Sequence, residues 1–90
     1  MLIITRHNAV IEFLAENGIT GKVISHVTND EMLAGQDVFG ILPVTMAAKC
    51  NTYTTISFEN LPQEYRGKEL TLEQMKEFGA YLETFKVIKL

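Results

Sequence analysis

The chain has no tryptophan, only one cysteine and no long apolar segment. Because Cys50 is alone, no disulfide can form within the chain, and its place in an apolar run predicts a buried, unreactive thiol. The apolar stretch at the N-terminus ends after about four residues, which is too short for a signal peptide, and no segment is long enough to span a membrane. These absences predict a cytoplasmic protein.

An excess of positive charge is also missing. The 90 residues include 8 basic and 11 acidic side chains, which give a net charge of -3 at pH 7. Proteins that bind long nucleic acids without sequence preference present broad basic surfaces, so we do not expect that activity here. A small phosphorylated ligand needs only a local cationic site, and the composition is compatible with one.

Common nucleotide-binding and metal-binding patterns are absent as well. Gly18 and Gly21 fit neither dinucleotide nor P-loop spacing, and no serine-nucleophile motif occurs. One cysteine with His7 and His26 cannot complete a zinc site without carboxylates. We therefore expect no cofactor and no metal.

The chain does contain 47% hydrophobic residues, enough for one small folded domain over 1–90 with a thin core. Short apolar runs alternate with helical patterns along it. Strands are expected at 2–6, 22–27, 37–42 and 53–58, helices at 8–17 and 44–51, and polar connections at 28–36 and 59–70. Gly18 fits the C-terminal cap of the first helix.

A last helix is expected after a capping box formed by Thr71 and Gln74. The residues at helical spacing on its apolar face are Leu72, Met75, Phe78, Leu82 and Phe85. A short strand over 85–90 is the alternative for the end of the chain.

This alternation predicts a three-layer, Rossmann-like α/β fold with a mostly parallel sheet of about four or five strands. In such a sheet the carboxyl ends of the strands share one edge, and ligands bind in the crevice formed by the loops that follow. The strand ends expected at that edge are Thr5, Val27, Leu42 and Phe58.

The loop Thr5-Arg6-His7-Asn8 is the strongest candidate site. It follows the first predicted strand and precedes a helix, whose free N–H groups and dipole favour an anion. Arg6 can hold a phosphate bidentately, and His7 can act as a general acid or base near neutral pH. A plain surface turn, in which Thr5 or Asn8 caps the helix, is the alternative.

The loop after the third predicted strand is the second candidate. Gly40 allows a ligand to approach the backbone closely, and Leu42 and Pro43 follow it. Taken alone, this motif is better explained by helix initiation at Pro43. In the second predicted strand, alternation favours a partly buried His26 against a helix layer and places Ser25 on the opposite face.

The polar connection 59–70 can fold over the crevice. It carries Glu59, Asn60, Arg66 and Glu69, and Arg66 would add a second cation to a phosphate site. A solvated connector is the alternative, because charged loops are usually just exposed.

Several short motifs, in this order and spacing, resemble one known family. They are Thr5-Arg6-His7 followed by Ala9; Gly35-Gln36-Asp37-Val38 leading into Gly40-Ile41-Leu42-Pro43-Val44 and Ala47-Ala48; and Leu61-Pro62 with Arg66-Gly67-Lys68-Glu69-Leu70-Thr71, then Met75 and Phe78-Gly79-Ala80. Over nearly its whole length the chain resembles the small CRISPR-associated proteins of type III systems that are grouped with the ring nucleases.

The resemblance implies a minimal relative of the Rossmann-like domains that sense cyclic oligoadenylates (a CARF-like domain), acting as a homodimer. It implies cyclic tetra-adenylate as the ligand, the second messenger of type III systems. It further implies a metal-independent cleavage in which a ribose 2′-hydroxyl attacks the neighbouring phosphate, giving linear products with a 2′,3′-cyclic phosphate. The activity would switch off, or evade, type III signalling.

The residues fit that chemistry. We expect Arg6 to stabilise the phosphate in the transition state and His7 to donate the proton to the leaving 5′-oxygen. The residues expected in binding are Thr5, Asn8, Gly40, Leu42, Pro43 and Arg66. A homodimer would present two copies of each loop to opposite phosphates of the ring.

Three other functions remain open from the sequence. A protein that binds the same cyclic nucleotide without cleaving it would need the same crevice. A protein-interaction module would use the domain only as a surface, and fold analogy does not exclude it. A metal-dependent nuclease would use Asp37 and Glu59.

Overall fold

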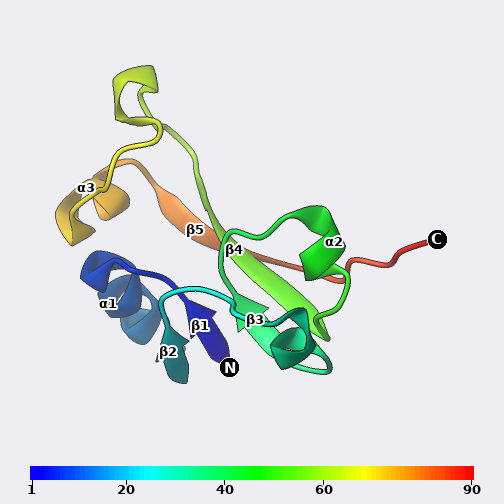
Figure 1. Ribbon diagram of the computed structural model, residues 1–90. Coiled ribbons are helices and arrows are strands. Elements are labelled where there is room, and N and C mark those ends of the chain that lie inside the picture. The colour runs from blue at the N-terminus through cyan, green and yellow to red at the C-terminus, as the bar shows by residue number, and fades with distance from the viewer.

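A five-stranded sheet forms the centre of the molecule in the computed structural model, which describes all residues, 1–90 (Figure 1). Its strands are β1 (Leu2–Ile4), β2 (Lys22–Ile24), β3 (Asp37–Phe39), β4 (Thr52–Phe58) and β5 (Ala80–Phe85). The strand order is β2-β1-β3-β4-β5, in which the first four strands are parallel and β5 runs antiparallel to β4. The predicted α/β fold with a mostly parallel sheet is confirmed.

Helices lie on both faces of this sheet (Figure 1). They are α1 (Asn8–Glu16), α2 (Val44–Ala47) and α3 (Leu72–Glu77), with short 3-10 turns η1 (Asp30–Leu33) and η2 (Gln63–Tyr65). The helices α1 and α3 contact each other at one face, while η1 and α2 cover the other. None of these helices has the length and apolar character needed to cross a membrane.

The two faces of the sheet bury separate small cores. Ile3 and Phe39 pack with Leu14 of α1, whereas Leu2 and Val38 pack with Leu33 and Cys50 on the other side. Adjacent residues of one strand divide between the two cores because successive side chains of a strand point to opposite faces. β1 is apolar along its whole length, and β3 is apolar after its exposed first residue, Asp37, as expected for strands covered on both faces.

The last predicted helix is confirmed only over α3, and the prediction that it continues to Phe85 is wrong. The capping box of Thr71 and Gln74 is present, but α3 ends at Glu77, and Gly79 follows in the left-handed conformation with φ +72°. Leu82 and Phe85 belong to β5, where they pair with Ile56 and Tyr53 of β4. The alternative strand over 85–90 is also wrong, because β5 ends at Phe85.

The other predicted elements are correct in type, and all but β4, which begins one residue earlier than predicted, are shorter than expected. The first three strands end at Ile4, Ile24 and Phe39, and α2 ends at Ala47. Apolar residues continue past these points because the loops that follow still pack on the core, as Leu42 and Val27 do. Gly18 has φ +76° directly after the cap of α1, which confirms its predicted place.

Candidate functional site

A crevice of about 720 Å³ opens at the edge where the parallel strands end. Its walls come from the segments that follow β1, β2, β3 and β4, together with residues 61–70 before α3. The parallel order of β1 to β4 brings these segments together, as the sequence pattern led us to expect.

The crevice combines an apolar interior with a charged rim. Its apolar lining includes Val10, Phe39, Ile56, Phe58, Leu61, Tyr65, Leu70 and Met75. Arg6 and Lys68 are the cations on its wall, and Glu69 is the carboxylate. The rim therefore has a positive balance although the chain as a whole carries -3. Such a lining suits a ligand that has both apolar ring faces and negative charge.

The turn after β1 places Thr5, Arg6 and His7 on the wall. The backbone N–H of Thr5 donates to Ile24 O at 3.0 Å, which ties the turn to β2. The Thr5 hydroxyl accepts a hydrogen bond from the backbone N–H of His7 at 3.2 Å, and so shapes the turn. None of the three ion pairs of the structure includes Arg6, so this exposed guanidinium is available to a ligand.

The start of α1 leaves backbone donors beside Arg6. His7 is the N-cap residue, and neither its side chain nor that of Thr5 caps the first N–H groups of the helix. No acidic residue occupies the first turn. Asn8 is the first residue of α1 and is exposed, but it does not line the crevice. The anion-attracting end of α1 therefore stays free of a competing carboxylate from its own turn.

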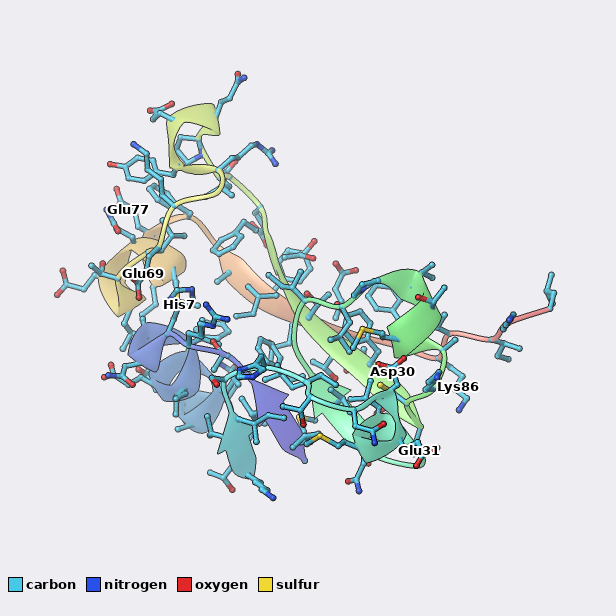
Figure 2. All side chains as sticks on the ribbon, viewed as in Figure 1. His7, Asp30, Glu31, Glu69, Glu77 and Lys86 are labelled. Atoms are coloured by element: carbon cyan, nitrogen blue, oxygen red, sulfur yellow. The ribbon has the colours of Figure 1, made fainter.

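The His7 ring makes one side-chain hydrogen bond. Its Nδ1 lies 2.7 Å from Oε1 of Glu69, and the two side chains are 49% and 64% exposed. Figure 2 shows the two residues side by side, His7 at the start of α1 and Glu69 on the segment that leads into α3. Glu69 was expected in a loop that folds over the crevice, but its pairing with His7, 62 residues away, could not be predicted from the spacing of residues in the sequence.

Of the three residues expected to bind a ligand in the loop after β3, only one lines the crevice. Gly40 is buried and lines the crevice, and a Cβ there would lie 3.3 Å from the Cβ of Ile4. Leu42 and Pro43 do not line it: the N–H of Leu42 donates to the Tyr53 hydroxyl at 3.0 Å, and Pro43 is the N-cap of α2. The side chain that reaches the wall from this loop is Ile41.

Arg66 also lies off the crevice wall. It is exposed at the end of η2, and Gly67 then turns the chain with φ +79°. Lys68 is the cation that this turn brings to the wall, and the sequence reasoning missed it. The run Arg66-Gly67-Lys68-Glu69 contained the signal, but only the conformation of Gly67 decides which basic side chain faces the crevice.

The expectation for His26 is wrong. Because β2 ends at Ile24, strand alternation no longer applies, and His26 is exposed rather than packed against a helix layer. Ser25 and His26 do not point to opposite faces, since their side chains hydrogen-bond to each other at 2.9 Å between Oγ and Nδ1. Ser25 lines the crevice.

A shared metal site of Asp37 and Glu59 is also ruled out by their positions. Asp37 lies opposite Thr52 at the start of β4, whereas Glu59 follows the end of β4, roughly 20 Å farther along the strands. Asp37 instead accepts hydrogen bonds from Thr52 at 2.7 Å and Asn51 at 2.8 Å, which lower its pKa. No three His, Cys, Asp or Glu side chains lie close enough to hold a metal ion.

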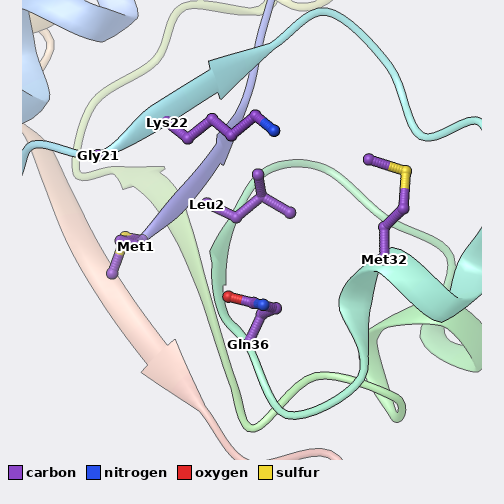
Figure 3. Close-up of a pocket in the computed structure, with 6 residues that line it drawn as sticks. All are labelled: Met1, Leu2, Gly21, Lys22, Met32 and Gln36. Carbon is purple, nitrogen blue, oxygen red and sulfur yellow. The ribbon is translucent and has the colours of Figure 1, made fainter.

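A second depression, of about 470 Å³, lies at the opposite edge of the sheet, where β1 and β2 begin (Figure 3). The residues around it are Met1, Leu2, Gly21, Lys22, Met32 and Gln36. Lys22 is its one charged side chain, and no carboxylate, histidine, cysteine or hydroxyl side chain lines it. The arrangement of charged and proton-transferring groups therefore favours the first crevice as the functional site.

Comparison with known proteins gives one family. A family model described as "Putative CRISPR-associated protein (Cas_VVA1548)" matches residues 2–88, which is nearly the entire chain. No curated protein and no solved structure matches the chain. On the strength of that match, the chain belongs to this family of CRISPR-associated proteins.

Proposed function

We propose that this protein is a metal-independent ring nuclease that cleaves cyclic tetra-adenylate in the cytoplasm. It would thereby switch off, or evade, type III CRISPR signalling. The observation that carries the proposal is the pairing of Arg6 and His7 on the wall of one crevice, at the start of α1. A cation without an ion-pair partner and a proton-transferring ring beside it are what phosphodiester cleavage by an internal hydroxyl requires.

The proposed reaction is an in-line displacement at phosphorus. The ribose 2′-oxygen forms a bond to the neighbouring phosphorus and gives up its proton to water, while the bond from phosphorus to the 5′-oxygen breaks. Arg6 stabilises the charge on the non-bridging oxygens, and Nε2 of a protonated His7 gives its proton to the leaving 5′-oxygen. The products are a linear oligoadenylate with a 2′,3′-cyclic phosphate end and a histidine that regains its proton from solvent.

The apolar lining supports a nucleotide over a simple phosphate. Phe58 and Tyr65 contribute partly exposed aromatic rings to a crevice whose charged side chains are exposed. Adenine bases offer flat apolar faces to such rings, and base–aromatic stacking typically contributes about 1–3 kcal/mol per base. Lys68 adds a second cation on the wall for the phosphates.

A homodimer completes the proposal. A cyclic tetranucleotide has phosphates on opposite sides, and a two-fold axis beside the crevice would present one Arg6–His7 pair to each side. Two large apolar side chains support this arrangement, because Ile41 on the crevice wall is 92% exposed and Val44 at the start of α2 is 69% exposed. A second copy of the chain would remove both from water.

The proposal is tested by alanine variants under multiple-turnover conditions with excess cyclic tetra-adenylate. His7→Ala is expected to lower kcat at least about a hundredfold by removing the proton donor, and Arg6→Ala about a hundredfold by removing charge stabilisation. Lys89→Ala, an exposed residue near the end of the chain, is the matched control and should retain full activity. Unchanged turnover of His7→Ala would remove this residue from the mechanism.

A further inference from the structure

Glu69 is the one side chain that hydrogen-bonds to the His7 ring, and it comes from a distant part of the chain. Its carboxylate has no lysine or arginine partner, although Arg66 and Lys68 are close in sequence. The hydrogen bond between His7 and Glu69 is also the only one that joins residues 61–70 to the remainder of the molecule. The imidazole ring of His7 is therefore the one side-chain hydrogen-bond partner of the Glu69 carboxylate.

We propose that Glu69 is a positioning residue that fixes the tautomer and orientation of His7 for proton transfer in the crevice. This inference rests on the function proposed above. The carboxylate is an acceptor only, so the nitrogen it faces, Nδ1, must carry a hydrogen. Nε2 is then the ring nitrogen left to exchange a proton with a bound ligand, because the hydrogen bond of one imidazole nitrogen sets the state of the other.

The fold holds Glu69 in place from both sides. On its N-terminal side, the ring of Tyr65 packs on that of Phe78, with 5.0 Å between the ring centroids. On its C-terminal side, the capping box of Thr71 and Gln74 anchors the start of α3. The carboxylate thus sits on a short segment between two fixed points, which limits the positions that its oxygen can take.

The first test reads the tautomer directly and needs no catalysis. Long-range ¹H–¹⁵N spectra of the full chain, at a pH high enough to leave the ring neutral, identify the nitrogen that carries the proton. His26, the only other histidine, is an internal reference. We expect His7 to carry its proton on Nδ1 in the wild type and in Glu69→Gln, whose amide oxygen still accepts. In Glu69→Ala the two tautomers should mix.

Glu73→Ala is the matched control for the tautomer, because Glu73 is an exposed carboxylate four residues away that forms no hydrogen bond or ion pair with His7. It should leave the His7 spectrum unchanged. A His7 proton on Nε2 in the wild type, or a His7 spectrum that Glu69→Ala does not alter, would overturn the inference.

The second test separates positioning of His7 from mere retention of the 61–70 segment. A positioning role predicts that Glu69→Ala lowers kcat about tenfold or more with little change in KM, and that Glu69→Gln restores most of kcat. A raised KM with unchanged kcat would show that Glu69 only holds the segment, and would contradict the inference. If the wild type does not cleave cyclic tetra-adenylate, the proposed function fails, and the tautomer spectra still decide whether Glu69 orients His7.

Discussion

Two carboxylates of this chain, Glu69 and Asp37, lie at opposite edges of the sheet and differ in their partners. Glu69 faces His7 at the crevice, whereas Asp37 accepts hydrogen bonds from Thr52 and Asn51 where β3 begins. Both donors favour the ionised form of Asp37 and hold its pKa below the ordinary value of 3.8. At the residue scale, Asp37 is therefore a structural link between β3 and β4 rather than a member of the site.

This link predicts a pH-dependent contribution to stability. Because the pKa of Asp37 is lower in the folded chain, its stabilisation is present above the ordinary pKa of 3.8 and is lost as the pH falls from there through the lowered value. Asp37→Asn keeps an acceptor oxygen and removes the charge, so it should be less stable than the wild type at neutral pH. In urea unfolding, the difference in the free energy of unfolding between the two proteins should shrink below pH 3.8. A difference that is constant with pH would contradict this role.

At the scale of elements, the capping box is the feature that secures α3. The Thr71 hydroxyl accepts the N–H of Gln74 at 3.1 Å, and the Gln74 side chain accepts the N–H of Thr71 at 3.0 Å. Thr71→Ala should lower the free energy of unfolding by about 1 kcal/mol, because the N–H of Gln74 loses its hydroxyl partner. Thr71→Ser keeps the hydroxyl and should unfold like the wild type in urea. Equal stability of the alanine variant would show that the cap is redundant.

The parallel sheet was predictable because its strands are short apolar runs between helical patterns. The turn at Thr5, Arg6 and His7 followed from the same logic, since ligands bind where parallel strands end. The strand β5 was not predictable from spacing alone. Phe78, Leu82 and Phe85 lie four and three residues apart, which fits a helix, and only pairing with β4 turns the last two into strand residues.

The candidate site was predictable in part, for a related reason. Residues fixed by a strand end, such as Arg6 and His7, lie on the crevice wall as expected. Residues whose direction depends on a turn did not follow from the sequence: Lys68 occupies the wall where Arg66 was expected. The hydrogen bond between His7 and Glu69 forms because residues 61–70, between β4 and α3, lie beside the start of α1. No local sequence pattern predicts that arrangement.

At the scale of the whole molecule, the thin core and the exposed apolar side chains are the features on which the proposed homodimer rests. Only 13 of the 90 residues are buried, and Ile41 on the crevice wall and Val44 at the start of α2 are exposed. Sedimentation equilibrium should therefore give a mass twice the 10.1 kDa of the chain. Ile41→Asp is expected to shift the protein toward monomer, because burying a charge in an apolar interface is unfavourable.

Val23→Asp is the matched control for this prediction. Val23 is also exposed, but it lies on β2 at the far edge of the sheet from β5. This variant should keep the mass of the wild type. A wild type that is monomeric at micromolar concentrations would contradict the dimer.

The most direct test of the central claim is a multiple-turnover assay of the purified protein. It combines excess cyclic tetra-adenylate with a metal chelator and follows the products by chromatography and mass spectrometry. The account predicts linear oligoadenylates that end in a 2′,3′-cyclic phosphate, in amounts beyond one equivalent of protein. Intact ligand, either held by the protein in fixed proportion or not bound at all, would contradict it.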